Sequence, residues 1–364
     1  MERSGKRIAF VLGGMTFGGA ERVISILANH YAAMGWRVDI ITMLKPECDF
    51  ELDLSIRHLH LGGSARASRL LRVLWMPTWL LRLRRYLNKE RPAALVSFAA
   101  RINCMSLGMA LTLPAKKRPR LIVSERNDPM KDTRTALVRR LTEQLYPRAD
   151  RIVFQTTHAM NCFSEKVRKK GVIVPNPVDA KVPRADVPAK KIVAVGKLMR
   201  QKNHALLLDA FARLKEEFPG HTLRIYGDGV LREELQERIR SLGLEGRAVL
   251  EGWRTDVAEQ IADAELFVLP SNYEGLSNAL MEALAMGLPC VSTNCAGAED
   301  LIEDGVNGRV VPVGDPDALT AAMRELLSDP ASARRMGEMA RRKSASFAAG
   351  PILERWDGMV SGRG

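Results

Sequence analysis

The sequence has few aromatic residues, few cysteines and no long uncharged segment. Phe, Trp and Tyr make up 5% of the 364 residues, which is little for a surface that stacks nucleic-acid bases. The five cysteines are an odd number and include no Cys-x-x-Cys pair, so we expect no disulfide framework or zinc finger. No uncharged segment reaches the roughly 18 residues of a membrane-spanning helix. We therefore expect a cytoplasmic protein that contacts membranes only peripherally.

The composition is that of a soluble globular chain with an uneven distribution of charge. Hydrophobic residues make up 46% and charged residues 27%, and the length predicts two domains. Residues 1–175 contain 31 basic and 14 acidic residues, a net charge of +17, and the remainder contains 24 and 28, a net charge of −4. The first half is therefore expected to meet an anionic partner, either a nucleic acid or a membrane surface.

Short β-branched runs alternate with helix-length amphipathic stretches along the whole chain. This rhythm predicts βαβ units in two doubly wound parallel sheets. The segment Pro175-Asn176-Pro177 disfavours helix and strand and marks the boundary. The predicted domains are residues 1–175, which form an N-terminal acceptor-side domain, and 176–346, which bind the donor. An apolar stripe of Phe347, Ile352, Leu353 and Trp356 belongs to a C-terminal segment, 347–364.

The stretch from residue 66 to residue 91 combines basic and apolar side chains at helical spacing. Its basic residues include Arg69, Arg72, Arg82 and Arg85, and leucines and tryptophans lie between them. Such a helix is typical of a membrane-surface element, although an ordinary surface helix with its leucines in the core would look the same. Pro77 is expected to kink or split it.

In each predicted domain, a glycine-containing turn follows the first predicted strand. Gly13-Gly14 and Gly18-Gly19 precede a helix, where backbone N–H groups can approach a phosphate or a sugar. Asp39 lies twenty residues beyond Gly19, which keeps a dinucleotide site open, although the Gly-x-Gly-x-x-Gly pattern is missing. In the second half, Gly196-Lys197 and Lys202-Asn203 follow a strand, and their two lysines can neutralise a diphosphate.

The segment 270–284 carries the most chemistry. Ser277 or Asn278 is a good N-cap for the helix that follows, and the first turn of that helix is an anion site. Glu282, one turn into the helix, can accept ribose hydroxyls. Glu274, before the helix, can reach a sugar on the other side of a diphosphate. The segment therefore predicts a nucleotide-sugar site.

These motifs occur in the order seen in retaining glycosyltransferases of family 4. The resemblance rests on Gly18-Gly19-Ala20-Glu21, Gly196…Lys202-Asn203, Tyr226-Gly227-Asp228-Gly229, Glu274-x7-Glu282 and Gly305-x-Asn307-Gly308. It is strongest to bacterial enzymes that extend undecaprenyl-diphosphate-linked oligosaccharides. It implies an α/β fold of the GT-B type, two Rossmann-like domains facing a cleft, with the last helix crossing back to the first domain.

The resemblance also implies roles for matching residues. Lys202 and Lys197 would bind the donor diphosphate, Glu274 the donor sugar and Glu282 the ribose. The remaining donor-binding residues that it implies are Gly19, Gly275, Leu276, Ser277, Asn278 and Ala279.

Ser124-Glu125-Arg126-Asn127 matches a segment in which many relatives carry His after Glu. Arg126 is therefore grouped with Glu274 and Lys202 as catalytic, contacting a phosphate or an acceptor sugar. Gly18, Glu125 and Asn127 are assigned to the acceptor-side loops.

The sequence therefore predicts a retaining hexosyltransferase on the inner face of the cytoplasmic membrane. It would move a hexose or N-acetylhexosamine from a UDP-sugar to a polyprenyl-diphosphate-linked glycan. No metal is required, because lysines and a helix dipole offset the diphosphate charge. The alternatives are a sugar-nucleotide epimerase or phosphorylase, a nicotinamide-dependent oxidoreductase using Asp39, and a basic nucleic-acid-binding protein.

Overall fold

The computed structural model describes residues 5–16, 18–62, 69–132, 134–178, 184–295 and 297–362, and the side chains of residues 69–74 lie outside this description. The chain divides into two compact units. The first unit contains Met1–Pro177 together with Gly350–Gly364, and the second contains Val178–Ala349. These borders lie close to the predicted ones at residues 175 and 346.

The first unit is built on a seven-stranded parallel sheet in the order β3-β2-β1-β4-β5-β6-β7. Its strands are β1 (Arg7–Leu12), β2 (Arg37–Thr42), β3 (Arg57–His60), β4 (Ala94–Phe98), β5 (Arg120–Ser124), β6 (Arg151–Phe154) and β7 (Gly171–Ile173). Its helices are α1 (Gly19–Ala33), α2 (Arg69–Glu90), α3 (Ala100–Leu111), α4 (Ala136–Leu145), α5 (Thr157–Asn161), α6 (Glu165–Arg168) and α14 (Ala349–Ser361).

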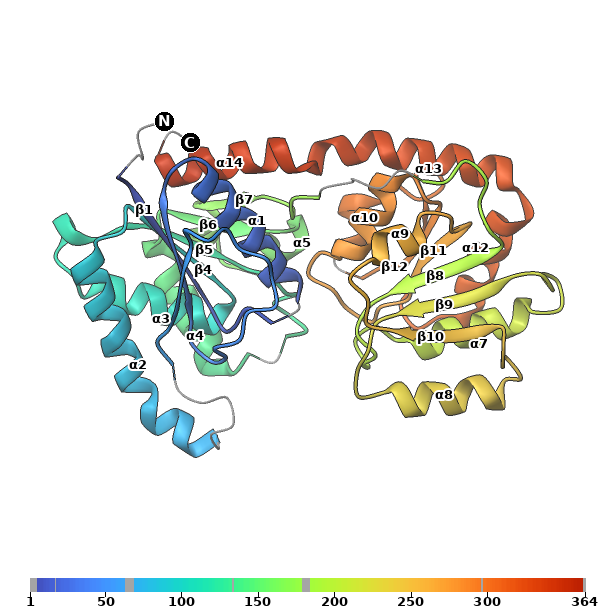
Figure 1. Cartoon of the computed structure of the whole chain (residues 1–364), viewed down its shortest axis with the longest axis horizontal. Helices are drawn as coiled ribbons and strands as arrows, with labels where there is room; N and C mark the ends of the chain where they lie inside the picture. The colour runs from blue at the N-terminus through green and yellow to red at the C-terminus, as the bar shows by residue number, and fades with distance from the viewer. Residues whose placement is uncertain are drawn as a thin grey trace. The chain divides into compact units, whose positions relative to one another are not determined.

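Helices cover both faces of this sheet, which is why its strands are continuously apolar rather than alternating (Figure 1). Helices α1 and α14 pack on one face, where Trp356 is fully buried and its ring lies 6.2 Å from that of Phe98. Helices α2, α3 and α4 pack on the other. Phe347, which the sequence grouped with the stripe of α14, instead packs in the core of the second unit.

The second unit is built on a six-stranded parallel sheet in the order β10-β9-β8-β11-β12-β13. Its strands are β8 (Lys191–Val195), β9 (Thr222–Tyr226), β10 (Ala248–Gly252), β11 (Leu266–Leu269), β12 (Cys290–Thr293) and β13 (Arg309–Val311). Its helices are α7 (His204–Leu214), α8 (Arg232–Ser241), α9 (Val257–Ile261), α10 (Asn278–Met286), α11 (Ala298–Leu301), α12 (Pro316–Ser328) and α13 (Pro330–Ser344).

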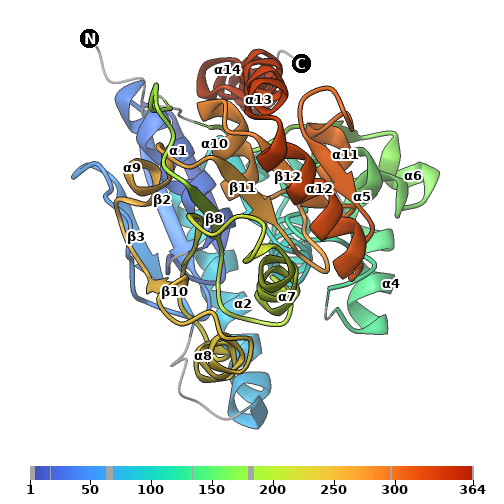
Figure 2. The same cartoon turned by 90° about the vertical axis from the view of Figure 1, so that its right-hand side faces the viewer.

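Strand β8 shows how this sheet is buried. Ile192 and Ala194 contribute to the core beneath α7, α8 and α12, whereas Val193 faces the core beneath α9 and α10 (Figure 2). Each of the two sheets therefore has the doubly wound order in which ligands bind at the carboxyl ends of the strands.

Two local expectations differ from the structure. Helix α2 runs unbroken through Pro77, so of the predicted kink or split the split is wrong. Its C-terminal half is held by Trp79, Leu83 and Leu87, which are buried in the core of the first unit, and this packing outweighs the hydrogen bond lost at Pro77. The short strand β13 was not predicted.

The packing of α14 gives a direct prediction. Replacing Trp356 by Ala should lower the free energy of unfolding by about 3–5 kcal/mol, because it leaves a cavity in the core of the first unit. Trp356→Phe should cost less, and Glu354→Ala, on the exposed side of the same helix, should cost almost nothing. Urea unfolding followed by circular dichroism measures all three, and equal stability of Trp356→Ala and Glu354→Ala would contradict the packing.

Candidate active site

The carboxyl ends of β8 and β11 bring the most important predicted residues together. These strands are neighbours at the centre of the second sheet, where the strand order reverses. The turn that follows β8 carries Lys202, and the loop that follows β11 carries Glu274. Such a switch point is where open parallel sheets bind their ligands.

Lys202 and Glu274 form an ion pair at this switch point. The Lys202 Nζ atom lies 2.6 Å from Glu274 Oε1, and the two side chains are 17% and 8% exposed. Ser271 Oγ donates to the same Oε1 atom at 2.7 Å. Glu274 Oε2 accepts no hydrogen bond from any residue that the structure describes. One carboxylate oxygen is thus fixed, and the other is available to a ligand.

Hydrogen bonds join the turn after β8 to the loop after β11. The Asn272 backbone N–H donates to the Gln201 carbonyl at 2.8 Å, and Gln201 Nε2 donates to the Tyr273 carbonyl at 3.0 Å. Asn203, in a left-handed conformation with φ of 48°, donates through Nδ2 to Asn272 Oδ1 at 3.0 Å. The ion pair therefore sits on a rigid support rather than between two independent loops.

Glycines allow a third segment to approach the turn after β8. A Cβ atom on Gly227, whose φ is +140°, would collide with the Gly196 carbonyl oxygen. One on Gly229 would collide with the carbonyl of Leu198. The Tyr226-Gly227-Asp228-Gly229 motif is thus explained by close backbone contact.

The start of α10 contains the predicted anion site. Ser277 is the N-cap, and its side chain accepts a hydrogen bond from the Leu280 N–H at 3.4 Å. Asn278 and Ala279 form the first turn, where backbone N–H groups face the amino end of the helix. Glu282 follows one turn later and is half-buried. Gly275 is half-buried and Leu276 is buried in the core beneath α10.

Three polar residues of this site were not predicted. Ser271 supports Glu274, and Thr293 at the end of β12 donates to the Ser271 carbonyl at 2.6 Å. Burial lowers the pKa of His204 to about 4, so this imidazole is neutral at pH 7 and adds no charge beside Lys202. Of the three, only Ser271 had a sequence signal, its place in the 270–284 segment. Lys197 is exposed, and its side chain pairs with no carboxylate among the described residues.

The predicted residues of the first unit lie in a different environment. Gly18 caps α1 and Gly19 begins it, at the carboxyl end of β1. Arg134 Nη2 lies 2.7 Å from Glu125 Oε2, and Tyr146 donates to Glu125 Oε1, so both carboxylate oxygens of the buried Glu125 are occupied. Arg126 is buried, whereas Asn127 is exposed.

The position of Asp39 argues against a dinucleotide site. Asp39 lies inside β2, is 1% exposed, and accepts hydrogen bonds from Arg7 and Arg57 at 2.8 and 2.9 Å and from Tyr86. Burial alone would raise the pKa of Asp39, but these hydrogen bonds lower it below its usual value. The carboxylate is therefore a structural ion-pair partner and not a ribose acceptor.

Helix α2 presents basic residues to solvent. Arg82 and Arg85 are exposed, as are Trp75 and Leu81, which are 53% and 62% accessible. The side chains of Arg69 and Arg72 lie outside the described part of the structure. Within the described ranges, no helix is both long enough and apolar enough to cross a membrane.

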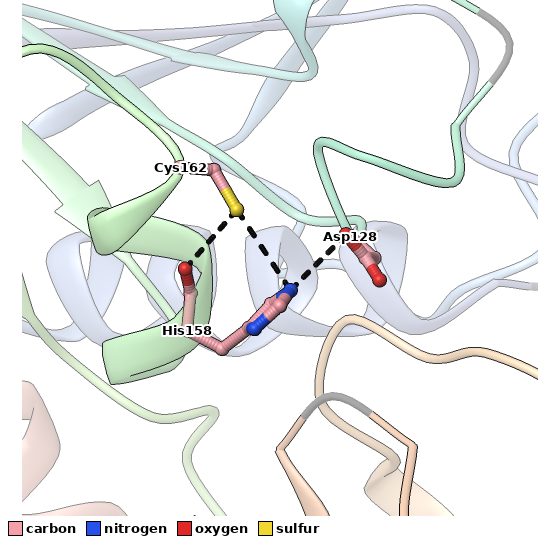
Figure 3. A group of neighbouring side chains, drawn as sticks. All are labelled: Asp128, His158 and Cys162. Atoms are coloured by element: carbon pink, nitrogen blue, oxygen red, sulfur yellow. Dashed lines mark hydrogen bonds and ion pairs between the residues drawn. The ribbon is translucent and has the colours of Figure 1, made fainter.

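Two groups of residues have the chemistry of metal ligands. Asp128, His158 and Cys162 cluster in the first unit, with His158 Nε2 3.5 Å from Asp128 Oδ1 and 3.8 Å from Cys162 Sγ (Figure 3). The triplet Asp315-Pro316-Asp317 instead caps α12, because Asp315 accepts from two backbone N–H groups and Asp317 pairs with Arg213. Neither group includes Lys202 or Glu274.

Two family models match the chain. The model described as Glycosyltransferase Family 4 covers residues 17–182, and the one described as Glycosyl transferases group 1 covers residues 189–329. Two curated relatives match over part of their length. An exopolysaccharide phosphotransferase of Streptomyces coelicolor is 32% identical over 23% of its chain and 58% of this one. A lipopolysaccharide core biosynthesis glycosyltransferase of Rhizobium meliloti is 33% identical over 44% of its chain and 42% of this one.

Other relatives match over nearly their whole length. The N-acetylgalactosamine-N,N'-diacetylbacillosaminyl-diphospho-undecaprenol 4-alpha-N-acetylgalactosaminyltransferase of Campylobacter jejuni is 29% identical, over 91% of this chain and 92% of its own. The structure of Anabaena HepE in complex with UDP has a TM-score of 0.80 at 17% identity, and the match covers 98% and 100% of the two chains. This likeness confirms the predicted GT-B class of two Rossmann-like domains.

The glycine contacts predict a specific instability. Replacing Gly227 by Ala adds a strained φ and a collision with Gly196, so it should destabilise the second unit by about 2–4 kcal/mol. Gly246 is the matched control: its φ is also positive, at +74°, but nothing lies within 4 Å of an added Cβ. Gly246→Ala should therefore cost only about 1–2 kcal/mol. Equal losses in urea unfolding would show that close approach at Gly227 does not matter.

Proposed function

Because this chain belongs to glycosyltransferase family 4, with a group 1 domain as its second unit, we propose that it transfers a hexose or N-acetylhexosamine from a UDP-sugar to a polyprenyl-diphosphate-linked glycan. The acceptor class is supported by the Campylobacter relative, whose name specifies a diphospho-undecaprenol substrate. The nucleotide is supported by the HepE structure, which contains UDP. The observation that carries the proposal is the Lys202–Glu274 pair at the β8/β11 switch point.

We assign the donor diphosphate to the basic side of this site. Lys202, with Lys197 beside it, would bind the phosphates together with the first turn of α10, from Ser277 to Ala279. Glu282 would accept the ribose hydroxyls. Gly275 and Leu276 would line the path of the donor between Glu274 and α10.

The charges at this site suit departure of a nucleoside diphosphate. Cleavage of the anomeric bond places negative charge on the diphosphate and positive charge on the sugar ring. Lys202 and the amino end of α10 would stabilise the negative charge on the diphosphate, and the Glu274 carboxylate is suited to stabilise the positive charge on the sugar ring. A departing phosphate oxygen would take the acceptor proton on the same face, which gives retention. The proposal needs no metal, because these groups offset the diphosphate charge.

The role of Glu274 is tested by Glu274→Gln. We expect transfer to fall at least about 100-fold, since a charged group aligned with the transition state is lost. UDP affinity should be unchanged or higher, because Glu274 no longer competes with the diphosphate for Lys202. Lys202→Gln should instead weaken UDP binding. Calorimetry with UDP and a radiolabelled transfer assay measure both effects.

The matched control for this experiment is Glu265→Gln. Glu265 also forms an ion pair, with His221 Nε2 at 2.8 Å, but it lies at the opposite end of β11. This variant should keep both UDP binding and transfer. Undiminished transfer by Glu274→Gln would refute the assigned role. If neither Lys202→Gln nor Lys197→Gln weakens UDP binding, the proposed donor site is refuted.

We also propose that α2 attaches the protein peripherally to the inner face of the cytoplasmic membrane. Its exposed Arg82 and Arg85 lie beside exposed Trp75 and Leu81, while Trp79 and Leu83 anchor the helix in the core. Basic and aromatic side chains next to each other suit an anionic lipid interface.

Membrane attachment is tested by reversing charges on α2. In flotation with anionic vesicles at low salt, Arg82→Glu with Arg85→Glu should weaken binding about tenfold or more, because each basic residue contributes about 1 kcal/mol. High salt should weaken wild-type binding. Arg335→Glu with Arg342→Glu, at exposed positions of α13, is the matched control and should bind like the wild type. Absence of wild-type binding at both salt concentrations would refute the membrane role.

A further inference from the structure

Arg126 is a buried cation at the carboxyl edge of the first sheet. It follows β5 by two residues, and its side chain is 8% exposed. Its neighbours come from the ends of adjacent strands: Phe98 ends β4, Gln155 follows β6, and Asn176 lies beyond β7. Arg126 therefore lies at the edge where parallel sheets bind ligands.

One side of the Arg126 guanidinium is held by protein. Nη1 donates to Asn176 Oδ1 at 2.6 Å, and Gln155 Nε2 donates to the same oxygen at 2.6 Å. The guanidinium carbon lies 3.9 Å from the centre of the Phe98 ring, an arrangement that supports a cation on an aromatic face. The guanidinium is thus fixed in position and orientation.

The other side has no protein partner. Nε and Nη2 of Arg126 are shielded from solvent, and neither has a hydrogen-bond partner among the described residues. The adjacent carboxylate of Glu125 does not serve, because Arg134 and Tyr146 occupy its oxygens. Burial lowers the pKa of Arg126 to about 9, so the cation is held in an unfavourable environment. Buried donors of a charged group are rarely left unpaired.

The two unpaired donors lie on one edge of a planar fork. The N–H bonds of Nε and Nη2 run parallel, and this edge matches two oxygens of a single phosphoryl or carboxylate group. Both nitrogens lie beneath the surface, so a ligand reaches them only when the atoms that cover them move aside. A guanidinium has no basic lone pair near pH 7, so the edge can bind an anion but cannot accept a proton.

We propose that Arg126 binds a phosphoryl group of the acceptor through the edge formed by Nε–H and Nη2–H. This assignment rests on the proposed function, which supplies a diphosphate-linked acceptor, and it makes Arg126 a binding residue for the acceptor. Phosphoryl is favoured over carboxylate because residues 1–175 carry a net charge of +17, which suits a multiply charged anion.

The test uses the full-length protein saturated with UDP, so that the donor diphosphate site is filled. Inorganic pyrophosphate and the soluble prenyl diphosphate geranyl diphosphate are titrated by calorimetry. Both should bind the wild type, and Arg126→Gln should weaken both at least tenfold while UDP affinity stays unchanged. Arg126→Lys should bind with intermediate affinity, because an ammonium cannot offer two parallel donors. In turnover, Arg126→Gln should raise the KM for the acceptor more than it lowers kcat.

Two further variants separate this site from its alternatives. Arg118→Gln removes an arginine of the same unit whose guanidinium bonds only to the backbone carbonyls of Leu113 and Leu111 among the described residues, and pyrophosphate binding should survive it. Lys202→Gln should lose UDP but keep pyrophosphate at Arg126, so failure of the donor site and failure of this proposal are distinguishable. A urea unfolding transition like that of the wild type, followed by circular dichroism, shows that the first unit of Arg126→Gln is folded.

Four outcomes would overturn the proposal. The first is equal pyrophosphate binding by the wild type and Arg126→Gln in the presence of UDP. The second is no binding of either diphosphate by the UDP-saturated wild type. The third is tighter binding of malonate than of pyrophosphate, which would assign the edge to a carboxylate. The fourth is that the wild type binds phosphatidylglycerol vesicles more tightly than Arg126→Gln does, while geranyl diphosphate does not bind. This result would assign the Arg126 edge to a lipid headgroup.

Discussion

The ion pair between Lys202 and Glu274 ties together two loops that are 72 residues apart in the sequence. Two charges this poorly exposed are stable together, whereas either one alone would be strongly unfavourable. Neighbouring backbone hydrogen bonds fix the two loops independently of the charges, so the site keeps its geometry when a ligand changes the partners. In the proposed reaction, the incoming diphosphate offers Lys202 a second anionic partner, and Glu274 can then turn toward the sugar.

The two units handle their acidic residues differently. In the first unit, Asp39 and Glu125 are buried and bonded to arginines, so they neutralise positive charge inside the domain. In the second unit, Glu274 keeps one oxygen without a protein partner among the described residues. The excess of positive charge in the first unit is thus carried by exposed residues such as Arg82 and by Arg126, whose burial leaves two donors unpaired.

Much of the fold was predictable, because parallel strands are short continuous apolar runs. Strands β4 (Ala94–Phe98) and β11 (Leu266–Leu269) are such runs, and the resemblance to a known family indicated the class of the fold. Strand β13 was missed because its three residues carry too little pattern. The continuity of α2 through Pro77 depends on tertiary packing, which local propensity does not describe.

The candidate site was predictable only where its chemistry lies in short segments. The 270–284 loop and the Lys202 turn each carry a local signal, but their direct contact follows from the strand order. Other features depend on distances between segments, which sequence spacing does not give. They are the support from Thr293, the burial of His204 and the pairing of Glu125 with Arg134. The unpaired edge of Arg126 could not be foreseen either, because the orientation of the guanidinium depends on the hydrogen bond from Nη1 to Asn176, 50 residues away.

Helix α14 belongs to the first unit although it follows the second unit in the sequence, so the first unit is assembled from two separate pieces of the chain. During synthesis, the ribosome therefore releases the complete second unit before the first can bury Trp356 and Ile352. Until then, the apolar face of the first sheet beside α1 lacks its cover, and the nascent chain carries an aggregation-prone surface. Premature termination directly after the second unit, at Ala349, would leave this surface open permanently.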